Sequence, residues 1–102
     1  MAIIHVDDKT FNNEIKDNNV LVDFYADWCG PCRMLTPILE NIDEDRTKVK
    51  IIKVNVDNAP TVAKTYGIMS IPTLIHFKDG KMISKKVGLC SKDAIIEMIN
   101  EW

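Results

Sequence analysis

The chain has 102 residues, of which 46% are hydrophobic and 27% are charged, and it contains only four glycines and four prolines. This balance is typical of a globular protein and excludes a disordered or fibrous chain, and the length fits one domain over residues 1–102 whose core needs no disulfide or metal. The formal net charge of −2 and the lack of a large basic patch predict no binding to nucleic acid.

The N-terminal stretch MAIIHVDDKTF indicates a short first strand over residues 3–6 rather than a secretory leader. It has no positively charged beginning, and His5 and Asp7 interrupt it before a hydrophobic region of about 7 to 15 residues is complete. No later stretch approaches the roughly 20 apolar residues of a membrane span. We therefore expect a cytoplasmic protein with no membrane partner.

Three elements follow in the first half of the chain. Residues 10–16 carry Phe11 and Ile15 at the four-residue spacing of a helix. Residues 20–26, VLVDFYA, are β-branched, aromatic and almost continuously apolar, which is typical of a strand buried on both faces. Apolar side chains then recur every three or four positions over residues 32–45, which predicts a longer helix.

A second strand and a third helix are predicted next. Residues 49–56, VKIIKVNV, have the β-branched character of a strand. Asn58 is expected to cap a helix because its side chain accepts hydrogen bonds from unpaired backbone N–H groups. That helix should continue to about Tyr66 and end at Gly67, where a left-handed conformation costs little.

The last part of the chain predicts a hairpin and a final helix. Strands over residues 73–77 and 82–87 flank Asp79-Gly80, a strong hairpin signal, and should therefore be antiparallel. Ser91 is expected to cap the final helix. Its buried face should consist of Ala94, Ile95, Met98 and Ile99. The order of elements predicts an α/β fold with a central mixed sheet of four to five strands, flanked on both faces by about four helices.

Two of the three cysteines lie in the stretch ADWCGPCR. A structural zinc site needs about four ligands, and beyond this pair the chain offers only Cys90, His5 and His76, in separate segments. We therefore expect no metal site. An odd cysteine count also argues against a framework of structural disulfides, so the Cys-x-x-Cys pair is interpreted as catalytic.

The position of the pair favours redox chemistry. Cys29 follows a predicted strand and should lie at a helix N-terminus, where unpaired N–H groups and the helix dipole stabilise a thiolate. Cys32 is one turn further on the same face, so it can donate its S–H to that thiolate and resolve a mixed disulfide. Gly30 and Pro31 add no charge between the sulfurs, although the two residues also fit an ordinary turn before a helix.

Asp23 is the second unusual feature, because it interrupts the apolar stretch VLVDFYA. If it is buried, its pKa is raised and it can serve as a general base for Cys32. The alternative is an edge strand from which Asp23 faces solvent. Lys53 is a candidate partner if the two strands are neighbours, and otherwise a lysine at a solvated strand end.

The motif WCGPC, together with the upstream Asp23 and the later Ile71-Pro72-Thr73, resembles the thioredoxin family. The blocks VDFYADWCGPCRMLTP, KVNVDN, YGIMSIPTLIHFKDG and KKVG extend the resemblance over essentially the whole chain. The resemblance implies the thioredoxin fold, with Cys29 as nucleophile and Cys32 as the buried resolving thiol of a redox-active disulfide. Asp23 and Lys53 would manage the proton of Cys32.

The resemblance also implies a cis peptide bond before Pro72, which would face the sulfurs and expose the backbone of Ile71 to an extended substrate segment. The positions that match the substrate-binding rim of the family are Trp28, Val56, Met69, Ile71, Val87, Gly88 and Leu89. Each of these residues also fits a plain core position. The sequence departs from many members at Tyr25, where a tryptophan is common, at Met69-Ser70, and at the additional Cys90. Cys90 is either a small buried hydrophobe or a regulatory thiol.

The function predicted in this way is that of a protein disulfide reductase, which maintains cytoplasmic protein thiols and donates electrons to reductive enzymes. The resemblance implies regeneration by a thioredoxin reductase, an NADPH-dependent flavoenzyme. The chain has no Gly-rich dinucleotide fingerprint, so we expect no bound cofactor. Expected partners are that reductase and disulfide-containing client proteins, with the chain as a monomer. The alternatives are a disulfide oxidase or isomerase of the same fold, and a binding subunit without catalysis.

Overall fold

The computed structural model describes residues 3–45 and 48–100. Within these residues the central element is a mixed sheet of five strands in the order β1-β3-β2-β4-β5. The strands are β1 (Ile4–Val6), β2 (Asn19–Tyr25), β3 (Lys50–Asn55), β4 (Thr73–Lys78) and β5 (Lys81–Val87). β3 pairs in parallel with β1 and β2, whereas β4 is antiparallel to both β2 and β5. The prediction of a mixed α/β sheet is confirmed.

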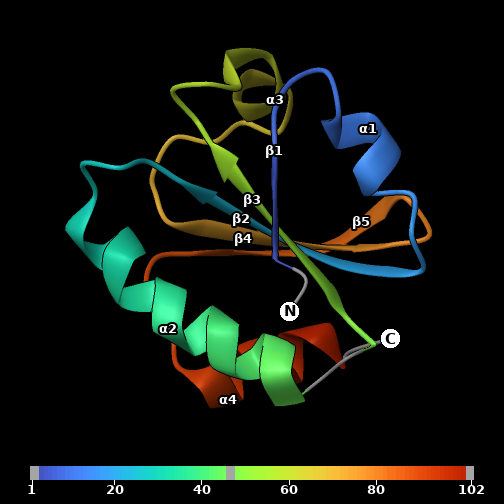
Figure 1. Ribbon diagram of the computed structural model, residues 1–102, viewed down its shortest axis with the longest axis vertical. Coiled ribbons are helices and arrows are strands. Elements are labelled where there is room, and N and C mark those ends of the chain that lie inside the picture. The colour runs from blue at the N-terminus through green and yellow to red at the C-terminus, as the bar shows by residue number, and fades with distance from the viewer. Residues whose placement is uncertain (1–2, 46–47, 101–102) are drawn as a thin grey trace.

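The described helices form two layers, one on each face of the sheet (Figure 1). They are α1 (Phe11–Glu14), α2 (Gly30–Asp45), α3 (Pro60–Thr65) and α4 (Lys92–Ile99). α1 and α3 cover one face, and α2 and α4 cover the other (Figure 1). α1 is shorter than the predicted helix over residues 10–16. Among the described helices, none combines the length and apolar character needed to cross a membrane.

β2 lies at the centre of the sheet and is buried on both faces. Val20, Val22 and Phe24 pack into the core beneath α1 and α3. Leu21 points the other way, into the core beneath α2 and α4. Asp23 has the same parity as Leu21, so it also lies on the α2 face. The nearly continuous apolar sequence of this strand follows from burial on both sides.

The predicted hairpin and the predicted cap of the last helix are confirmed. Asp79 and Gly80 have φ angles of 52° and 81°, the left-handed pair that a two-residue hairpin turn needs. The Ser91 side chain accepts a hydrogen bond of 3.1 Å from the backbone N–H of Ala94. Local turn and capping chemistry therefore determines both features.

The prediction that Asn58 caps the third helix is wrong. The N-cap of α3 is Ala59, and no side chain of its own segment caps the helix. Instead the Asp8 carboxylate accepts hydrogen bonds from the backbone N–H groups of Thr61 and Val62, at 3.2 and 2.9 Å. A carboxylate that is far away in the sequence thus replaces the local cap.

Candidate active site

The cysteine pair lies where β2 leads into α2. Cys29 is the residue before the first turn of α2, and its backbone N–H donates to the carbonyl oxygen of Ala26. Cys29 and Cys32 form a disulfide with their Cα atoms 5.3 Å apart. Their exposed fractions are only 5% and 2%. The pair forms a small apolar cluster with Ala26, against which Tyr25, Val56 and Ile71 pack.

The environment of the Cys29 sulfur favours negative charge. The backbone N–H of Cys32 donates to Cys29 Sγ over 3.2 Å. This N–H belongs to the first turn of a 16-residue helix that has no acidic residue in that turn. An N–H donor and the positive end of a helix dipole both stabilise a thiolate, so the site is built to lower the cost of ionising Cys29.

The segment before β4 forms the opposite wall of the site. The Ile71–Pro72 peptide bond is cis, the isomer that the resemblance implies. The carbonyl oxygen of Ile71 lies 3.8 Å from Cys29 Sγ. The backbone N–H of Gly88 donates to the carbonyl oxygen of Pro72 over 2.8 Å, which ties the end of β5 to the same wall.

The residues predicted as a substrate rim separate into an exposed and a partly buried group. Met69 is 95% exposed and Trp28 is 69% exposed. Val87 and Leu89 are also exposed. The partly buried members are Val56, Ile71 and Gly88. Exposed apolar side chains are the type of surface to which partner proteins bind.

Asp57 is a residue of this rim that the sequence did not single out. Its carboxylate accepts a hydrogen bond of 3.0 Å from the indole N–H of Trp28. The backbone N–H of Asp57 donates to the Asn55 side chain, which fixes the loop after β3. The contact joins residues 28 and 57, and no local sequence pattern marks such a long-range pair.

Asp23 is fully buried, so the alternative of a solvent-facing aspartate on an edge strand is wrong. It pairs in register with Lys53 on β3, and Asp23 Oδ2 lies 3.8 Å from Lys53 Nζ. Neither carboxylate oxygen has a hydrogen-bond partner among the described residues. Burial raises the pKa of Asp23 to about 6, and the charge of Lys53 offsets only part of that rise.

Lys53 connects this aspartate to the cysteine helix. Its ammonium group donates a hydrogen bond of 3.1 Å to Thr36 Oγ1. Thr36 in turn donates to the carbonyl oxygen of Cys32 over 3.3 Å. Lys53 is itself buried, so the alternative of a lysine at a solvated strand end is also wrong.

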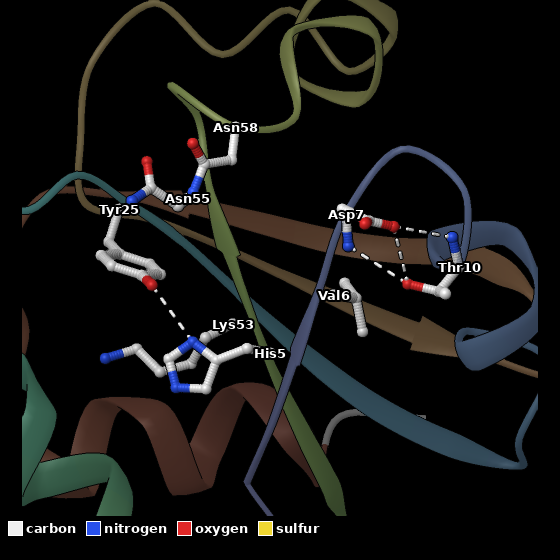
Figure 2. Close-up of a pocket in the computed structure, with 8 residues that line it drawn as sticks. All are labelled: His5, Val6, Asp7, Thr10, Tyr25, Lys53, Asn55 and Asn58. Atoms are coloured by element: carbon white, nitrogen blue, oxygen red, sulfur yellow. Dashed lines mark hydrogen bonds between the residues drawn. The ribbon is translucent and has the colours of Figure 1, made fainter.

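A second group of side chains surrounds a cavity of about 450 Å³ beside Lys53 (Figure 2). His5 Nδ1 and the Tyr25 hydroxyl are hydrogen-bonded at 3.1 Å, and the Lys53 ammonium lies 4.5 Å from the centroid of the Tyr25 ring. Burial, followed by the negative charges of Asp27 and Asp23, raises the pKa of the Tyr25 hydroxyl. The wall of the cavity is completed by Val6, Asp7, Thr10, Asn55 and Asn58. The sequence did not predict the contacts of His5 and Tyr25.

Cys90 is a free, half-buried cysteine that packs against the core beneath α2 and α4. Burial is the main reason that the pKa of its thiol is raised. Over residues 3–45 and 48–100, no three His, Cys, Asp or Glu side chains are grouped so that they could hold a metal ion.

Comparisons with known proteins agree with this geometry. A sequence model of the family described as Thioredoxin matches residues 2–101. The thioredoxin of Chlamydia caviae is 52% identical over 93 residues, which are 91% of each chain. The thioredoxin of Bacillus subtilis is 44% identical over 102 residues, 99% of this chain and 98% of the relative.

Solved structures show the same fold. A mutant thioredoxin from Halobacterium salinarum superposes with a TM-score of 0.91 at 38% identity, and the match covers 99% of this chain and 90% of that one. The oxidised mitochondrial thioredoxin 3 of Saccharomyces cerevisiae gives a TM-score of 0.89 at 35% identity, over 98% and 95% of the two chains. The chain therefore belongs to the thioredoxin family and is a thiol-disulfide oxidoreductase that reduces protein disulfides.

Proposed function

We propose that Cys29 is the attacking thiolate of this reductase and that Cys32 is the resolving thiol. The observation that carries this division is the hydrogen bond of 3.2 Å from the Cys32 backbone N–H to Cys29 Sγ at the start of α2. It favours charge on the sulfur of Cys29. The exposed fractions of the two residues are too similar to decide the order of attack on their own.

The reaction transfers two electrons and two protons from the dithiol to a client disulfide. The Cys29 thiolate attacks one sulfur of the client, which forms a mixed disulfide and releases the other client sulfur as a thiolate that takes up a proton. The Cys32 thiolate then attacks Cys29 Sγ, breaks the mixed disulfide and releases the second client thiol. The products are a reduced client and the Cys29–Cys32 disulfide.

Asp23 is proposed as the group that accepts the proton of Cys32. Its pKa of about 6 allows it to be ionised at neutral pH and still to bind a proton transiently. Lys53 connects Asp23 to Thr36, which is hydrogen-bonded to the backbone of Cys32. Burying an ionisable carboxylate costs free energy, and a subunit that only binds partners does not need such a group. The buried Asp23 therefore supports a catalytic protein over a binding subunit.

Clients are proposed to bind as an extended segment along the wall formed by Ile71 and Pro72. The carbonyl oxygen of Ile71 lies 3.8 Å from Cys29 Sγ, so backbone pairing there would bring a client disulfide close to the attacking sulfur. The exposed apolar side chains of Trp28 and Met69 would cover the client. Methionine adapts to differently shaped partners, which suits a reductase of many proteins.

The source of electrons is proposed to be a separate thioredoxin reductase that uses NADPH. The chain is proposed to act as a monomer in the cytoplasm and to hold no cofactor of its own. The sequence has no Gly-rich dinucleotide fingerprint, which supports a separate protein as the carrier of NADPH. The purified oxidised chain and reductase should consume one NADPH for each Cys29–Cys32 disulfide, and further oxidation of NADPH should require an added disulfide client.

Reduction of insulin with dithiothreitol as electron source tests the role of Cys29. The unmodified chain should accelerate insulin precipitation, and Cys29→Ser should reduce the rate to that of dithiothreitol alone. Cys90→Ser is the matched control, because Cys90 lies outside the disulfide, and it should retain the full rate. Equal rates for the unmodified chain and Cys29→Ser would rule out this role.

A further inference from the structure

His5, Lys53 and Asp23 occupy one register position across three neighbouring strands. His5 pairs with Lys53 between β1 and β3, and Lys53 pairs with Asp23 between β3 and β2. Tyr25 is two residues further along β2 than Asp23, so its side chain is on the same face of the sheet. The four side chains therefore form a continuous group beside α2.

The position of the Lys53 ammonium needs an explanation, because a lysine side chain has four rotatable bonds and a strongly hydrated charge. Its distance to Asp23 Oδ2, 3.8 Å, is longer than a hydrogen bond. Thr36 supplies one neutral acceptor. The cavity of about 450 Å³ beside Lys53 is lined in part by the polar side chains of Asn55 and Asn58. An ammonium group that turned toward this cavity would regain hydration.

The Tyr25 ring supplies the remaining contact. The Lys53 ammonium lies 4.5 Å from the centroid of the ring, within the range in which the face of an aromatic ring attracts a cation. In Figure 2 the ring stands over the Lys53 side chain, and a dashed line joins its hydroxyl to His5. The hydrogen bond to His5 Nδ1 restrains the orientation of the ring.

We propose that Tyr25 is a positioning residue of the reductase, which holds the Lys53 ammonium toward the Asp23 carboxylate and away from the neighbouring cavity, and that His5 fixes the Tyr25 ring for this purpose. The inference rests on the proposed role of Asp23 as proton acceptor. According to this proposal, Tyr25 and His5 influence the ionisation of Asp23 through the position of Lys53. The attraction between Lys53 and Asp23 weakens with distance, so the placement of Lys53 sets how easily Asp23 ionises.

Other ionisable groups lie around this pair on several elements. On β4 and β5 they are His76 and Lys86, which the strand register places on the same face of the sheet as Asp23. His5 lies on β1, and Asp7, which follows β1, lies at the rim of the cavity. The turn after β2 contributes Asp27, and α2 contributes Cys32 of the dithiol. The segment after β5 contributes Cys90, whose raised pKa includes a contribution from the charge of Asp23.

The proposal predicts the direction of a change in the pKa of Asp23. Without the ring, Lys53 turns toward the cavity, its stabilisation of the carboxylate weakens, and the pKa of Asp23 rises. A residue that merely covers Asp23 would have the opposite effect. Its removal would admit water, reduce the desolvation of the carboxylate and lower that pKa.

Carbon-13 NMR titration of the Asp23 carboxyl group, in both oxidised and reduced protein, measures this pKa directly. Tyr25→Leu should raise it by about half a pH unit, and Tyr25→Met is a second variant without a ring. Tyr25→Phe keeps the ring face and loses only the hydrogen bond to His5, so it should raise the pKa by less than Tyr25→Leu and by the same amount as His5→Ala. A lowered or unchanged pKa in Tyr25→Leu and Tyr25→Met would overturn the proposal.

A double substitution tests whether Tyr25 acts through Lys53. In a Lys53→Met background, Tyr25→Leu should produce no further rise in the pKa of Asp23. A rise of the same size in both backgrounds would show that Tyr25 acts on Asp23 directly. His5→Ala should raise the pKa by less than Tyr25→Leu, and only when the Tyr25 hydroxyl is present. The same rise in a Tyr25→Phe background would contradict the role given to His5.

The pH dependence of insulin reduction links the positioning effect to function. The acidic limb of the rate profile should move to higher pH in Tyr25→Leu by the same amount as the pKa of Asp23. Asp23→Asn separates the two claims. If Asp23→Asn leaves the rate profile unchanged, the proton role of Asp23 fails, while the NMR titration still decides the positioning role of Tyr25.

Discussion

The Asp23 carboxylate and the Lys53 ammonium face each other across β2 and β3, with Asp23 Oδ2 and Lys53 Nζ 3.8 Å apart. The carboxylate is fully buried, and the distance is too long for a hydrogen bond. Lys53 therefore offsets only part of the cost of burying a charge, and the pKa of Asp23 is raised from 3.8 to about 6. Asp23 consequently changes its charge close to neutral pH.

This raised pKa makes the protein less stable as the pH increases. Between pH 3.8 and about 6, Asp23 is protonated in the folded state and ionised in the unfolded state. The stability that comes from this proton is complete below pH 3.8 and is lost as the pH rises through about 6. Asp23→Asn should therefore raise the free energy of unfolding by about 3 kcal/mol at pH 8, and by much less at pH 4.

Urea unfolding at pH 4 and pH 8 measures this difference. Glu40→Gln removes an exposed carboxylate from α2 and serves as the control, with a change within about 0.5 kcal/mol at both pH values. A gain from Asp23→Asn that is equal at pH 4 and pH 8 would contradict a raised pKa.

Lys53→Met should destabilise the protein more at alkaline than at acidic pH. Removing the ammonium raises the pKa of Asp23 further, so an ionised Asp23 becomes more costly at pH 8 but stays protonated at pH 5. We expect the loss in the free energy of unfolding to be about 1–2 kcal/mol greater at pH 8 than at pH 5. In an Asp23→Asn background, the loss in the free energy of unfolding caused by Lys53→Met should become independent of pH. A pH dependence that persists in this background would contradict an electrostatic interaction between Lys53 and Asp23.

Asp57→Ala should affect client binding through Trp28. The substitution removes the acceptor of the indole N–H, so the exposed ring becomes free to reorient. We expect the KM for insulin to rise about twofold with kcat unchanged, and a stability loss below about 1 kcal/mol because the site is exposed. Time-resolved fluorescence anisotropy in a Trp102→Phe background should show faster motion of Trp28, while Asp57→Asn, which keeps an acceptor oxygen, should resemble the unmodified protein.

Asp8→Ala should destabilise α3 without affecting catalysis. It removes the carboxylate that accepts from the N–H groups of Thr61 and Val62. A lost helix cap costs about 1 kcal/mol, which lowers Tm by about 4–8 °C in a chain of this size. Asp8→Asn should recover part of that loss. An unchanged Tm in Asp8→Ala would show that Asp8 does not stabilise α3 as a helix cap.

The features that could be predicted from the sequence are those that neighbouring residues determine. Asp79-Gly80 specifies its turn through left-handed φ angles, and Ser91 caps α4 with its own side chain. The apolar stretch around Asp23 predicted a buried strand because both faces of β2 are covered. In each of these cases the physical cause lies within a few residues of the pattern.

Features that depend on the register between strands could not be predicted in this way. The sequence predicts the pairing of Asp23 with Lys53 only if their two strands are neighbours. The strand order itself is set by the packing of the whole sheet. Asn58 was predicted as a cap because it is the local candidate, whereas the actual cap comes from Asp8. The contact between His5 and Tyr25 arises because β1 and β2 both flank β3.

The division of labour between Cys29 and Cys32 is the central claim, and trapping the mixed disulfide tests it most directly. In a Cys90→Ala background, Cys32→Ser and Cys29→Ser are each incubated with insulin, and the adducts are mapped by mass spectrometry under nonreducing conditions. We predict that Cys32→Ser accumulates insulin joined to Cys29, and that Cys29→Ser accumulates far less adduct at the same time. Equal or greater adduct on Cys32 in Cys29→Ser, or no adduct on Cys29 in Cys32→Ser, would contradict the assignment.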